Sequence, residues 1–364
     1  MRVLFDVFEL TPDGGKSMGI YHYARNVWQE FVAALPEDMS LVLACHGQNE
    51  SDFPAVSHPR VERVLLQDET PRQWQRQRWL RWGAQALARQ KGCDVYFTPK
   101  GFLPGLWGAP MGVRTCAVVH DLIPLWYAEH QPGYFPRTEL AVLAHELRRT
   151  CRHADRLVTI SEASADDILK RVPDARRPAV VYNGLPPAPR QVVRPERAPF
   201  IFAMASSFPH KNAQAVMDGY QRYRAQVAAP LDLVVCGIAD PGQPGVSCLK
   251  GVSAEVLHGH YQAAELFVFL SRVEGFGFPP LEAMQHGTPV LCSDLPVLRE
   301  TTRGNAFFVS PVDADVVGAA IRHALADEQA EQRAHLRHRA QDVVASYSWR
   351  QCARGLLNQL GALA

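Results

Sequence analysis

The sequence has no long hydrophobic run. Among its 364 residues, the LFVFL stretch at 266–270 is only of strand length, well short of the ~18 apolar residues that a membrane-spanning helix requires. The N-terminal MRVLFDVFEL enters a strand-like run at once, without the basic region, apolar core and small-residue cleavage site of a signal peptide. These absences predict a cytoplasmic protein.

Net charge and closely paired cysteines are also lacking. The 38 basic and 37 acidic side chains leave a net charge of +1, which gives no reason to expect a nucleic acid partner. The eight cysteines are scattered without any Cys-x-x-Cys pair, and several stand inside apolar runs, where cysteine behaves as a small hydrophobe. This usage favours a reducing compartment over a disulfide framework.

The sequence contains no internal repeat and no low-complexity tract. It also lacks the Gly-x-Gly-x-x-Gly spacing of dinucleotide-binding enzymes after its first strand-like run, because FELTPDGGKSMG has a different spacing. A dehydrogenase is therefore disfavoured. The content of 47% hydrophobic and 21% charged residues is ordinary for a globular protein and excludes disorder as the main state.

Short apolar runs are what the sequence does have, each followed by a stretch with helical periodicity. Six lie at 3–10, 41–46, 94–99, 115–121, 156–161 and 179–184, and five at 200–206, 231–237, 266–271, 289–294 and 306–311. Runs that are apolar throughout are typical of parallel strands covered on both faces. Their alternation with helices predicts an α/β fold with doubly wound parallel sheets.

A proline-rich segment separates the two groups of runs. Residues 184–199 carry five prolines in sixteen positions, which removes backbone donors and stiffens the chain. With about 150 residues expected per domain, we predict an N-terminal domain at 1–184, a linker at 185–199 and a second domain from residue 200. Ligands of open parallel sheets bind at the carboxyl ends of the strands, in a crevice that two such domains would leave between them.

The most informative segment is SRVEGFGFPPLEAMQHGTPVLCSD at 271–294. A strand is expected to end at Ser271, and Pro279 and Pro280 stand where a helix would start, a favoured place for proline. Gly287 would end that helix. Glycines allow backbone to approach a ligand closely, and a helix N-terminus offers free N–H groups to phosphate.

Two carboxylates flank this loop, Glu274 before it and Glu282 in the first helical turn. A carboxylate accepts paired hydrogen bonds from vicinal hydroxyls, so the layout suits a sugar at one end of a diphosphate and a ribose at the other. On spacing alone, an ordinary glycine-rich turn explains the segment equally well, with Glu282 favouring the helix dipole.

The Glu-x7-Glu pattern within EGFGFPPLEAM…GTPV resembles the signature of family 4 retaining glycosyltransferases, which have the GT-B fold. Further blocks resemble this family in order along the chain, namely SMGIYHYARNV (17–27), VVHDLIPL (118–125), ISEASADDI (160–168), VVYNG (180–184), FPHKN (208–212), GVSAEVLHGHYQAAELFVFLS (251–271) and YSWRQCA (347–353). The resemblance implies two Rossmann-like domains, at 1–184 and 200–346, and a C-terminal helix at 347–364 that crosses back to the N-terminal domain.

Carried over residue by residue, the resemblance implies a donor site. The catalytic residues it implies are His120, Lys211 and Glu274. The donor-binding residues it implies are Gly19, Ser206, Lys211, Val252, Glu274, Gly275, Phe276, Gly277, Leu281 and Glu282. Glu274 would lie by the donor sugar, Glu282 by the ribose and Lys211 by the diphosphate. No cofactor and no metal are expected.

The chain departs from the family at one place. Many members have an arginine five or six residues before the lysine, where this chain has Ala205 and Ser206. Arginine makes bidentate phosphate contacts that serine cannot replace. Lys211 would then neutralise the diphosphate with less help, or His210 or a residue elsewhere would share the task.

The resemblance implies a retaining, metal-independent transfer of a hexose from a nucleotide diphosphate sugar to a glycan or lipid-linked acceptor, in polysaccharide or glycoconjugate synthesis. The HDLIPL form resembles that of bacterial enzymes that use GDP-mannose or dTDP-rhamnose for surface polysaccharides. GDP-mannose is the donor we expect, and UDP- or dTDP-sugars such as rhamnose remain open. A GT-B phosphorylase or epimerase and a non-catalytic assembly subunit are the alternatives. Acceptor contacts are expected in loops around 100–107 and 132–137, but the sequence does not indicate which of their residues make them.

Two other features favour structural interpretations. The basic, aromatic segment WQRQRWLRW at 74–82 is interpreted as a packed helix, although a lipid-linked acceptor keeps open a peripheral contact with the inner face of the cell membrane. His258 and His260 suggest a metal site, but the sequence shows no third ligand nearby.

Overall fold

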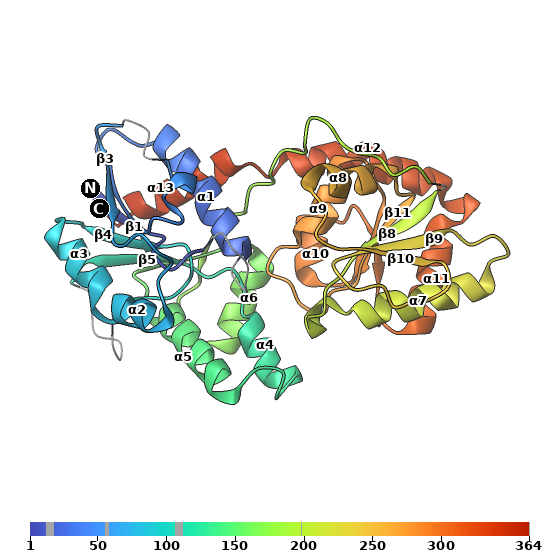
Figure 1. Ribbon diagram of the computed structural model, residues 1–364, viewed down its shortest axis with the longest axis horizontal. Helices are drawn as coiled ribbons and strands as arrows, with labels where there is room; N and C mark the ends of the chain where they lie inside the picture. Colours follow the sequence, from blue (N-terminus) through green and yellow to red (C-terminus); the bar gives the residue numbers. More distant parts are fainter. Residues whose placement is uncertain (12–17, 55–57, 106–111, 198, 364) are drawn as a thin grey trace. The chain divides into compact units, whose positions relative to one another are not determined.

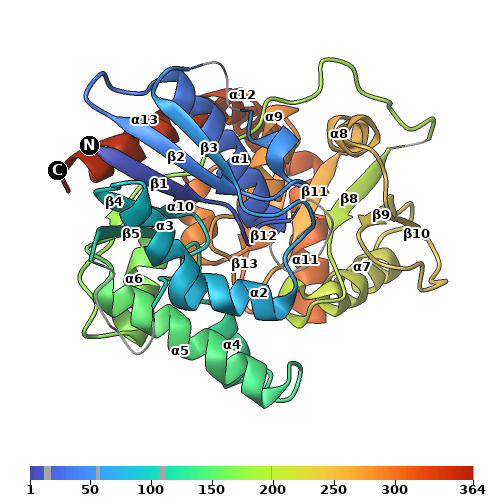
Figure 2. The same ribbon diagram turned by 60° about the vertical axis from the view of Figure 1, so that its left-hand side comes forward.

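A computed structural model describes residues 1–11, 18–54, 58–105, 112–197 and 199–363. Two parallel sheets organise the chain, which divides into one unit of Met1–Gly184 with Ser348–Ala364 and a second unit of Leu185–Tyr347 (Figures 1 and 2). The α/β, doubly wound fold class predicted from the alternating runs is confirmed, because every strand pairing in both sheets is parallel.

The first unit has a seven-stranded sheet of order β3-β2-β1-β4-β5-β6-β7. Its strands are β1 (Arg2–Asp6), β2 (Ser40–Cys45), β3 (Val61–Leu65), β4 (Val95–Thr98), β5 (Arg114–Val118), β6 (Arg156–Thr159) and β7 (Ala179–Val180). Its helical segments are α1 (Met18–Ala33), η1 (Glu50–Asp52), α2 (Gln73–Arg78), the π-helical η2 (Trp79–Gly83), α3 (Ala84–Gln90), α4 (Ile123–His130), α5 (Arg137–His153), α6 (Glu162–Arg171) and α13 (Trp349–Gly361).

Successive residues of β1 show why this sheet is buried on both faces. Leu4 belongs to a cluster with Trp79 and Leu87 from η2 and α3, whereas the Phe5 ring contacts Trp28 of α1 at a centroid distance of 5.2 Å. Side chains alternate between the faces of a strand. An uninterrupted apolar run is therefore needed where helices cover both faces.

The second unit has a six-stranded sheet of order β10-β9-β8-β11-β12-β13. Its strands are β8 (Phe200–Met204), β9 (Asp232–Cys236), β10 (Val246–Leu249), β11 (Leu266–Phe269), β12 (Val290–Ser293) and β13 (Phe307–Val309). Its helical segments are η3 (Pro209–Lys211), α7 (Ala213–Gln226), α8 (Ala254–Ala263), α9 (Phe278–Gln285), α10 (Pro296–Thr301), α11 (Ala314–Leu325), η4 (Asp327–Gln329) and α12 (Ala330–Ala345).

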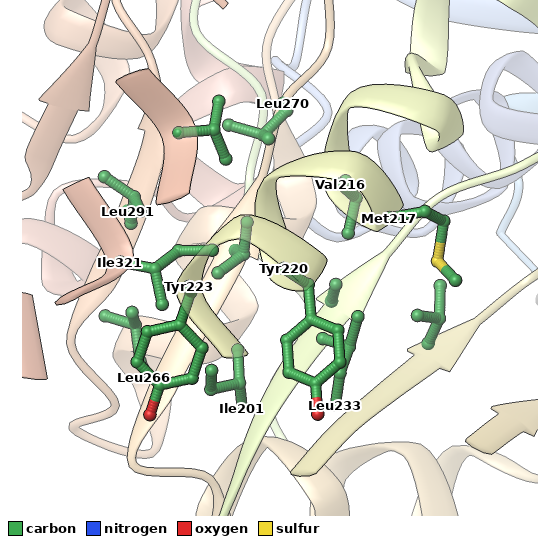
Figure 3. Close-up of a cluster of buried hydrophobic side chains, with 14 of the residues drawn as sticks. Ile201, Val216, Met217, Tyr220, Tyr223, Leu233, Leu266, Leu270, Leu291 and Ile321 are labelled. Atoms are coloured by element: carbon green, nitrogen blue, oxygen red, sulfur yellow. The ribbon is translucent and has the colours of Figure 1, made fainter. Parts of the chain in front are cut away.

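The core of the second unit lies between the strands and the helices α7 and α11 (Figure 3). Strand residues such as Ile201 and Leu266 meet Tyr220 of α7 and Ile321 of α11, all buried. The two helices approach closely at Gly219, where a Cβ atom would lie 2.2 Å from Val317 Cγ1. This close packing of α7 and α11 fixes the segment before α7, which carries part of the candidate site.

Residues 185–197 of the proline-rich segment contain no helix or strand. The Leu185 amide donates to the Tyr347 carbonyl at 3.1 Å, and the Val193 amide donates to the Glu255 carbonyl at 3.1 Å. Gly259 of α8 lies directly under this segment, since a Cβ there would be 1.9 Å from the Val193 carbonyl oxygen. These residues therefore pack along the second unit, and their assignment as a linker stays a prediction.

The packed-helix interpretation of residues 74–82 is right for one tryptophan and wrong for two. Trp79 is buried against Phe8 and donates its Nε1–H to Asp6 Oδ2 at 2.8 Å. Trp74 and Trp82 are 58% and 56% exposed. The sheet offers room for one indole only, and the other two side chains point to the outer side of the helical segment.

Candidate functional site

The loop between β11 and α9 carries the candidate donor site. Gly277 precedes α9 and has left-handed backbone angles of φ 87° and ψ 63°, which only glycine adopts without strain. A Cβ atom at Gly277 would also lie 2.5 Å from Leu298 Cδ2. Prolines occupy the first positions of the helix, as predicted from their place in the sequence. The chain therefore turns sharply here and directs the helix N-terminus toward the loop.

Lys211 and Glu274 come together at the carboxyl ends of β8 and β11, which are neighbouring strands. Lys211 Nζ lies 2.5 Å from Glu274 Oε1 and 5.5 Å from the centre of the Phe269 ring. The two loops are also joined through the backbone, because the Arg272 amide donates to the His210 carbonyl at 2.8 Å. The lysine keeps two further N–H donors, which an incoming anion could use.

The role of His210 in place of the absent arginine stays a prediction, and its surroundings favour the neutral imidazole. Burial and the nearby Lys211 charge lower the pKa of His210 to about 4, so the imidazole is neutral near pH 7. Arg272 is exposed and follows Ser271 at the end of β11. It lies within the segment 271–294, and its role was not recognised from the sequence because the signature there consists of the glycines and the two glutamates.

Glu282 lies on α9 and accepts a hydrogen bond from the Tyr261 hydroxyl, with Oε2 at 2.9 Å. Burial raises the pKa of Glu282, and the Tyr261 hydrogen bond opposes that rise by favouring the carboxylate. Tyr261 itself is fully buried between Phe202 and Phe267. The tyrosine thus fixes one oxygen of Glu282 and leaves the other for a ligand.

The remaining predicted donor residues of the second unit are placed as follows. Ser206 Oγ accepts from the Phe208 amide at 3.4 Å, and Val252 precedes the helix cap formed by Ser253. Leu281 and Phe276 are buried, and the Phe276 ring contacts Tyr347 at 5.4 Å. Both residues are buried as a whole, and the backbone contact expected for Phe276 stays a prediction.

The two histidines of the His-Gly-His segment have different partners. His258 Nδ1 lies 2.8 Å from His286 Nε2, whereas His260 Nδ1 faces the Val256 carbonyl at 2.8 Å. Among the residues that the structure describes, no group of three His, Cys, Asp or Glu side chains is placed to hold a metal ion.

His120 stands at the end of β5 in the first unit. Its Nε2–H donates to the Pro99 carbonyl at 2.8 Å, which leaves Nδ1 as an acceptor, and its ring lies 4.6 Å from the Tyr23 ring. Burial lowers the pKa of His120 to about 4, so the ring is neutral near pH 7. Asp121 holds the turn, because its Oδ1 accepts from the Ile123 amide at 2.9 Å.

Gly19 is exposed near the start of α1, and no atom of the described residues lies within 4 Å of a Cβ position there. Ser17, which opens the motif containing Gly19, lies outside the described residues, as do Leu106 and Trp107 of the predicted acceptor loop. The structure thus groups Lys211 with Glu274 and Glu282 with Tyr261 in the second unit, and His120 and Gly19 in the first.

Two Rossmann-like units, each built on a parallel sheet, are the architecture of the GT-B class of glycosyltransferases. Comparison with family models agrees with this class. The model "Glycosyltransferase Family 4" matches residues 24–188 and the model "Glycosyl transferases group 1" matches residues 187–343. Together they span most of the chain, and the chain belongs to this glycosyltransferase family.

Similar proteins include the O-antigen chain mannosyltransferase RfbU of Salmonella typhimurium, which is 28% identical over 218 residues; these cover 56% of this chain and 59% of that protein. The O-antigen chain mannosyltransferase B of Escherichia coli is 26% identical over 338 residues, 85% of each chain.

Solved structures show the same fold. Sucrose-phosphate synthase from Thermosynechococcus elongatus has a TM-score of 0.69 at 18% identity, with 100% of each chain covered. HepE from Anabaena, solved in complex with UDP-glucose, has a TM-score of 0.67 at 15% identity, also with 100% of each chain covered.

Proposed function

We propose that the protein is a retaining glycosyltransferase that moves mannose from GDP-mannose to a hydroxyl of a glycan or lipid-linked saccharide in polysaccharide synthesis. The observation that carries the proposal is the Lys211–Glu274 pair beside the N-terminus of α9, with Glu282 held by Tyr261 on the same helix. Mannose is favoured because RfbU and mannosyltransferase B are both named mannosyltransferases of the O-antigen chain. GDP as the nucleotide follows from the resemblance of the HDLIPL segment and not from these names.

Each part of the donor is proposed to contact different residues. Breaking the bond between sugar and diphosphate builds negative charge on the leaving group, and Lys211 with the amides at the start of α9 would stabilise it. Glu274 would then exchange its bond with Lys211 for bonds with sugar hydroxyls, while Glu282 accepts from the ribose. Arg272 is the candidate for the cation that Ala205 and Ser206 do not provide.

Retention is assigned to front-face attack, in which the leaving phosphate oxygen takes the proton of the acceptor hydroxyl. No side-chain nucleophile is needed in this scheme, and Glu274 is not given that role. Neutral His120 presents Nδ1 as an acceptor for a donor-sugar hydroxyl. We propose that no metal takes part, because lysine and helix amides can carry the charge of the leaving group.

The test is a thermal-shift series with GDP, UDP, dTDP and ADP, since a ligand that binds only the folded protein raises its apparent stability. We expect the largest shift with GDP, a loss of that shift in Lys211→Met, and an unchanged shift in the control Lys250→Met, whose side chain is exposed. Activity with GDP-mannose should survive EDTA. A loss of activity restored by manganese would contradict the metal-free scheme.

The alternative donors are UDP- and dTDP-sugars, and HepE, the structure with UDP-glucose bound, makes a UDP-sugar the second candidate. A larger thermal shift with UDP or dTDP would replace GDP-mannose. Incubation with donor alone distinguishes the other classes, because an epimerase would convert the sugar without an acceptor. Nucleotide binding without any turnover would indicate a non-catalytic subunit.

A membrane contact is proposed from the exposed face of α2 and η2. Trp74, Arg78, Arg81 and Trp82 are all exposed there, and Trp and Arg together suit the interface of an anionic bilayer. No described helix has the length and apolar character needed to span a membrane. The contact would therefore be peripheral, at the inner face of the cell membrane, where a lipid-linked acceptor would be found.

Sedimentation with phosphatidylglycerol vesicles tests this contact. The double variants Trp74→Ala/Trp82→Ala and Arg78→Gln/Arg81→Gln should bind vesicles more weakly than the parent. The control Arg322→Gln/Arg339→Gln makes the same change in charge at exposed sites of α11 and α12. Equal vesicle binding by all of these proteins would contradict the proposal.

A further inference from the structure

Glu9 and Lys100 form an ion pair in the first unit that none of the assigned roles uses. Glu9 follows β1 and Lys100 follows β4, and these are neighbouring strands of the sheet. Lys100 Nζ lies 2.7 Å from Glu9 Oε2, and the two side chains are 18% and 8% exposed. The pair therefore lies at the carboxyl edge of the sheet, where parallel sheets bind their ligands.

Within the part of the chain that the structure describes, one oxygen of this buried pair has no partner. Glu9 Oε1 is buried and accepts no hydrogen bond from these residues, whereas Asp6, three residues earlier, uses Oδ1 for the Phe8 amide and Oδ2 for Trp79 and Tyr96. A buried carboxylate oxygen without a donor costs free energy, and a buried ion pair is weak evidence for stability because desolvation offsets the attraction. Stability therefore does not explain the pair.

The pair is also connected to His120. The Pro99 carbonyl holds His120 Nε2 at 2.8 Å, and Lys100 is the next residue along the chain. The Lys100 amide is fixed by Thr98 Oγ1 at 3.3 Å, and its ammonium lies 5.8 Å from the Phe102 ring. Lys100 and His120 thus follow adjacent strands and are held by one short segment.

The chemistry of the pair fits a saccharide. A sugar hydroxyl both donates and accepts hydrogen bonds; Glu9 Oε1 can accept one, and the ammonium has two N–H donors beyond the one used by Glu9. Two adjacent hydroxyls would satisfy both groups at once. The opposite charges of Glu9 and Lys100 offset each other, so a neutral sugar suits this position better than a phosphate or a carboxylate.

We propose that Glu9 and Lys100 bind a pair of hydroxyls on a neutral sugar residue of the acceptor. The assignment of this sugar to the acceptor rests on the proposed glycosyltransferase function. Glu9 Oε1 accepts from one hydroxyl and Lys100 Nζ donates to its neighbour, which selects a saccharide acceptor with two free adjacent hydroxyls at this position.

The test uses variants that keep the size of each side chain, Glu9→Gln and Lys100→Met, with Lys100→Arg as a variant that retains the donors. The chain offers a matched control in Glu62 and Lys91, which are also paired, at 2.5 Å, but are 37% and 28% exposed and belong to β3 and the end of α3. Lys91→Met removes an ion pair away from the carboxyl edge, and Glu62→Gln removes the same pair together with the ion pair between Glu62 and Arg2.

Binding of methyl α-D-mannopyranoside to the full chain is measured by saturation-transfer NMR, with the protein saturated with the nucleoside diphosphate that gives the largest thermal shift. We expect binding by the parent and both controls, at least a fivefold weaker dissociation constant in Glu9→Gln and Lys100→Met, and a smaller loss in Lys100→Arg. Melting temperatures of all variants in the absence of ligand show whether each one folds.

The outcomes separate the two proposals. If no nucleoside diphosphate raises the melting temperature of the parent, the proposed function fails, and the sugar measurement made without nucleotide still tests the hydroxyl site. If nucleotide binds but the parent shows no saturation transfer to the mannoside, or if folded Glu9→Gln and Lys100→Met bind it as tightly as the parent, the hydroxyl site is wrong.

Discussion

At the scale of single residues, Tyr261 and Glu282 show how burial and one hydrogen bond set a charge. Burial raises the pKa of Glu282, and the hydrogen bond from the Tyr261 hydroxyl lowers it. Removing that donor would raise the pKa of Glu282 further. The carboxylate would then be protonated at a higher pH and would lose part of its capacity to accept from ribose hydroxyls.

We therefore expect Glu282→Ala to weaken nucleotide binding by about 1–3 kcal/mol, the range for a hydrogen bond to a charged group. Tyr261→Phe should bind nearly normally at pH 8 and lose affinity more steeply than the parent as the pH falls to 5.5. Calorimetric titration over this pH range measures both effects.

Tyr220→Phe is the matched control for Tyr261→Phe, because Tyr220 is equally buried in the same unit and its hydroxyl donates to backbone carbonyls of Leu231 and Gly245 instead. If Tyr261→Phe and Tyr220→Phe have the same pH profile, the hydrogen bond does not control the charge of Glu282.

The sequence was informative about residues that belong to a spaced motif and silent about those that do not. Glu274 and Glu282 could be selected because their spacing brackets a glycine-rich turn. Tyr261 and Glu9 could not be selected, since a tyrosine in a helix and a glutamate after a strand are ordinary residues until their partners in space are known. Their partners are 21 and 91 residues away.

At the scale of elements, the turn before α9 depends on Gly277, because a substitution there would cost free energy in two separate ways. Any other residue would be strained at its positive φ, and its Cβ would collide with Leu298. We expect Gly277→Ala to destabilise the second unit by about 1–3 kcal/mol, the usual cost of such strain, and to weaken nucleotide binding because the start of α9 would shift.

Gly287, after the same helix, also has a positive φ of 72° but no atom within 4 Å of a Cβ position. Gly287→Ala therefore isolates the strain from the collision and should cost less than Gly277→Ala in denaturant unfolding. Adding Leu298→Ala to Gly277→Ala removes the collision and should recover part of the nucleotide affinity, although the loss of this fully buried side chain also leaves a cavity that lowers stability. If Gly277→Ala and Gly287→Ala lower the free energy of unfolding equally, the residues around Leu298 accommodate the added methyl group and the collision has no cost.

The elements that sequence reasoning missed are strands at the sheet edges. The eleven predicted runs all contain a strand, but β3 and β10 were not predicted, and both lie at an edge. In β3 the residues are VERVL with partial exposure, and in β10 they are VSCL, all half-buried. Edge strands can be covered less completely, and β3 and β10 lack an apolar run for this reason. The other two edge strands, β7 and β13, lie within predicted runs.

At the scale of the whole molecule, the end of the chain is part of the first unit. Helix α13 packs on α1, and the Trp349 ring lies 5.8 Å from the Tyr23 ring. The start of α13 also lies against Gly184, since a Cβ atom at Gly184 would be 2.2 Å from the Trp349 amide nitrogen. Leu356 and Leu360 are completely buried. Removing residues 348–364 would therefore expose the apolar side of α1 and impair folding of the first unit.

Because each unit has its own core and the nucleotide-binding residues are proposed for the second, stability changes should separate in calorimetry. Leu356→Ala leaves a cavity against the first unit, at a cost of about 2–5 kcal/mol, and should lower the unfolding transition of that unit. The control Arg350→Ala changes an exposed residue of the same helix and should leave it unchanged. Added nucleoside diphosphate should raise the other transition, in the parent and in Leu356→Ala alike. If Leu356→Ala and nucleotide instead move one common transition in opposite directions, the two cores unfold as a single cooperative unit, and the expected separation of the transitions is wrong.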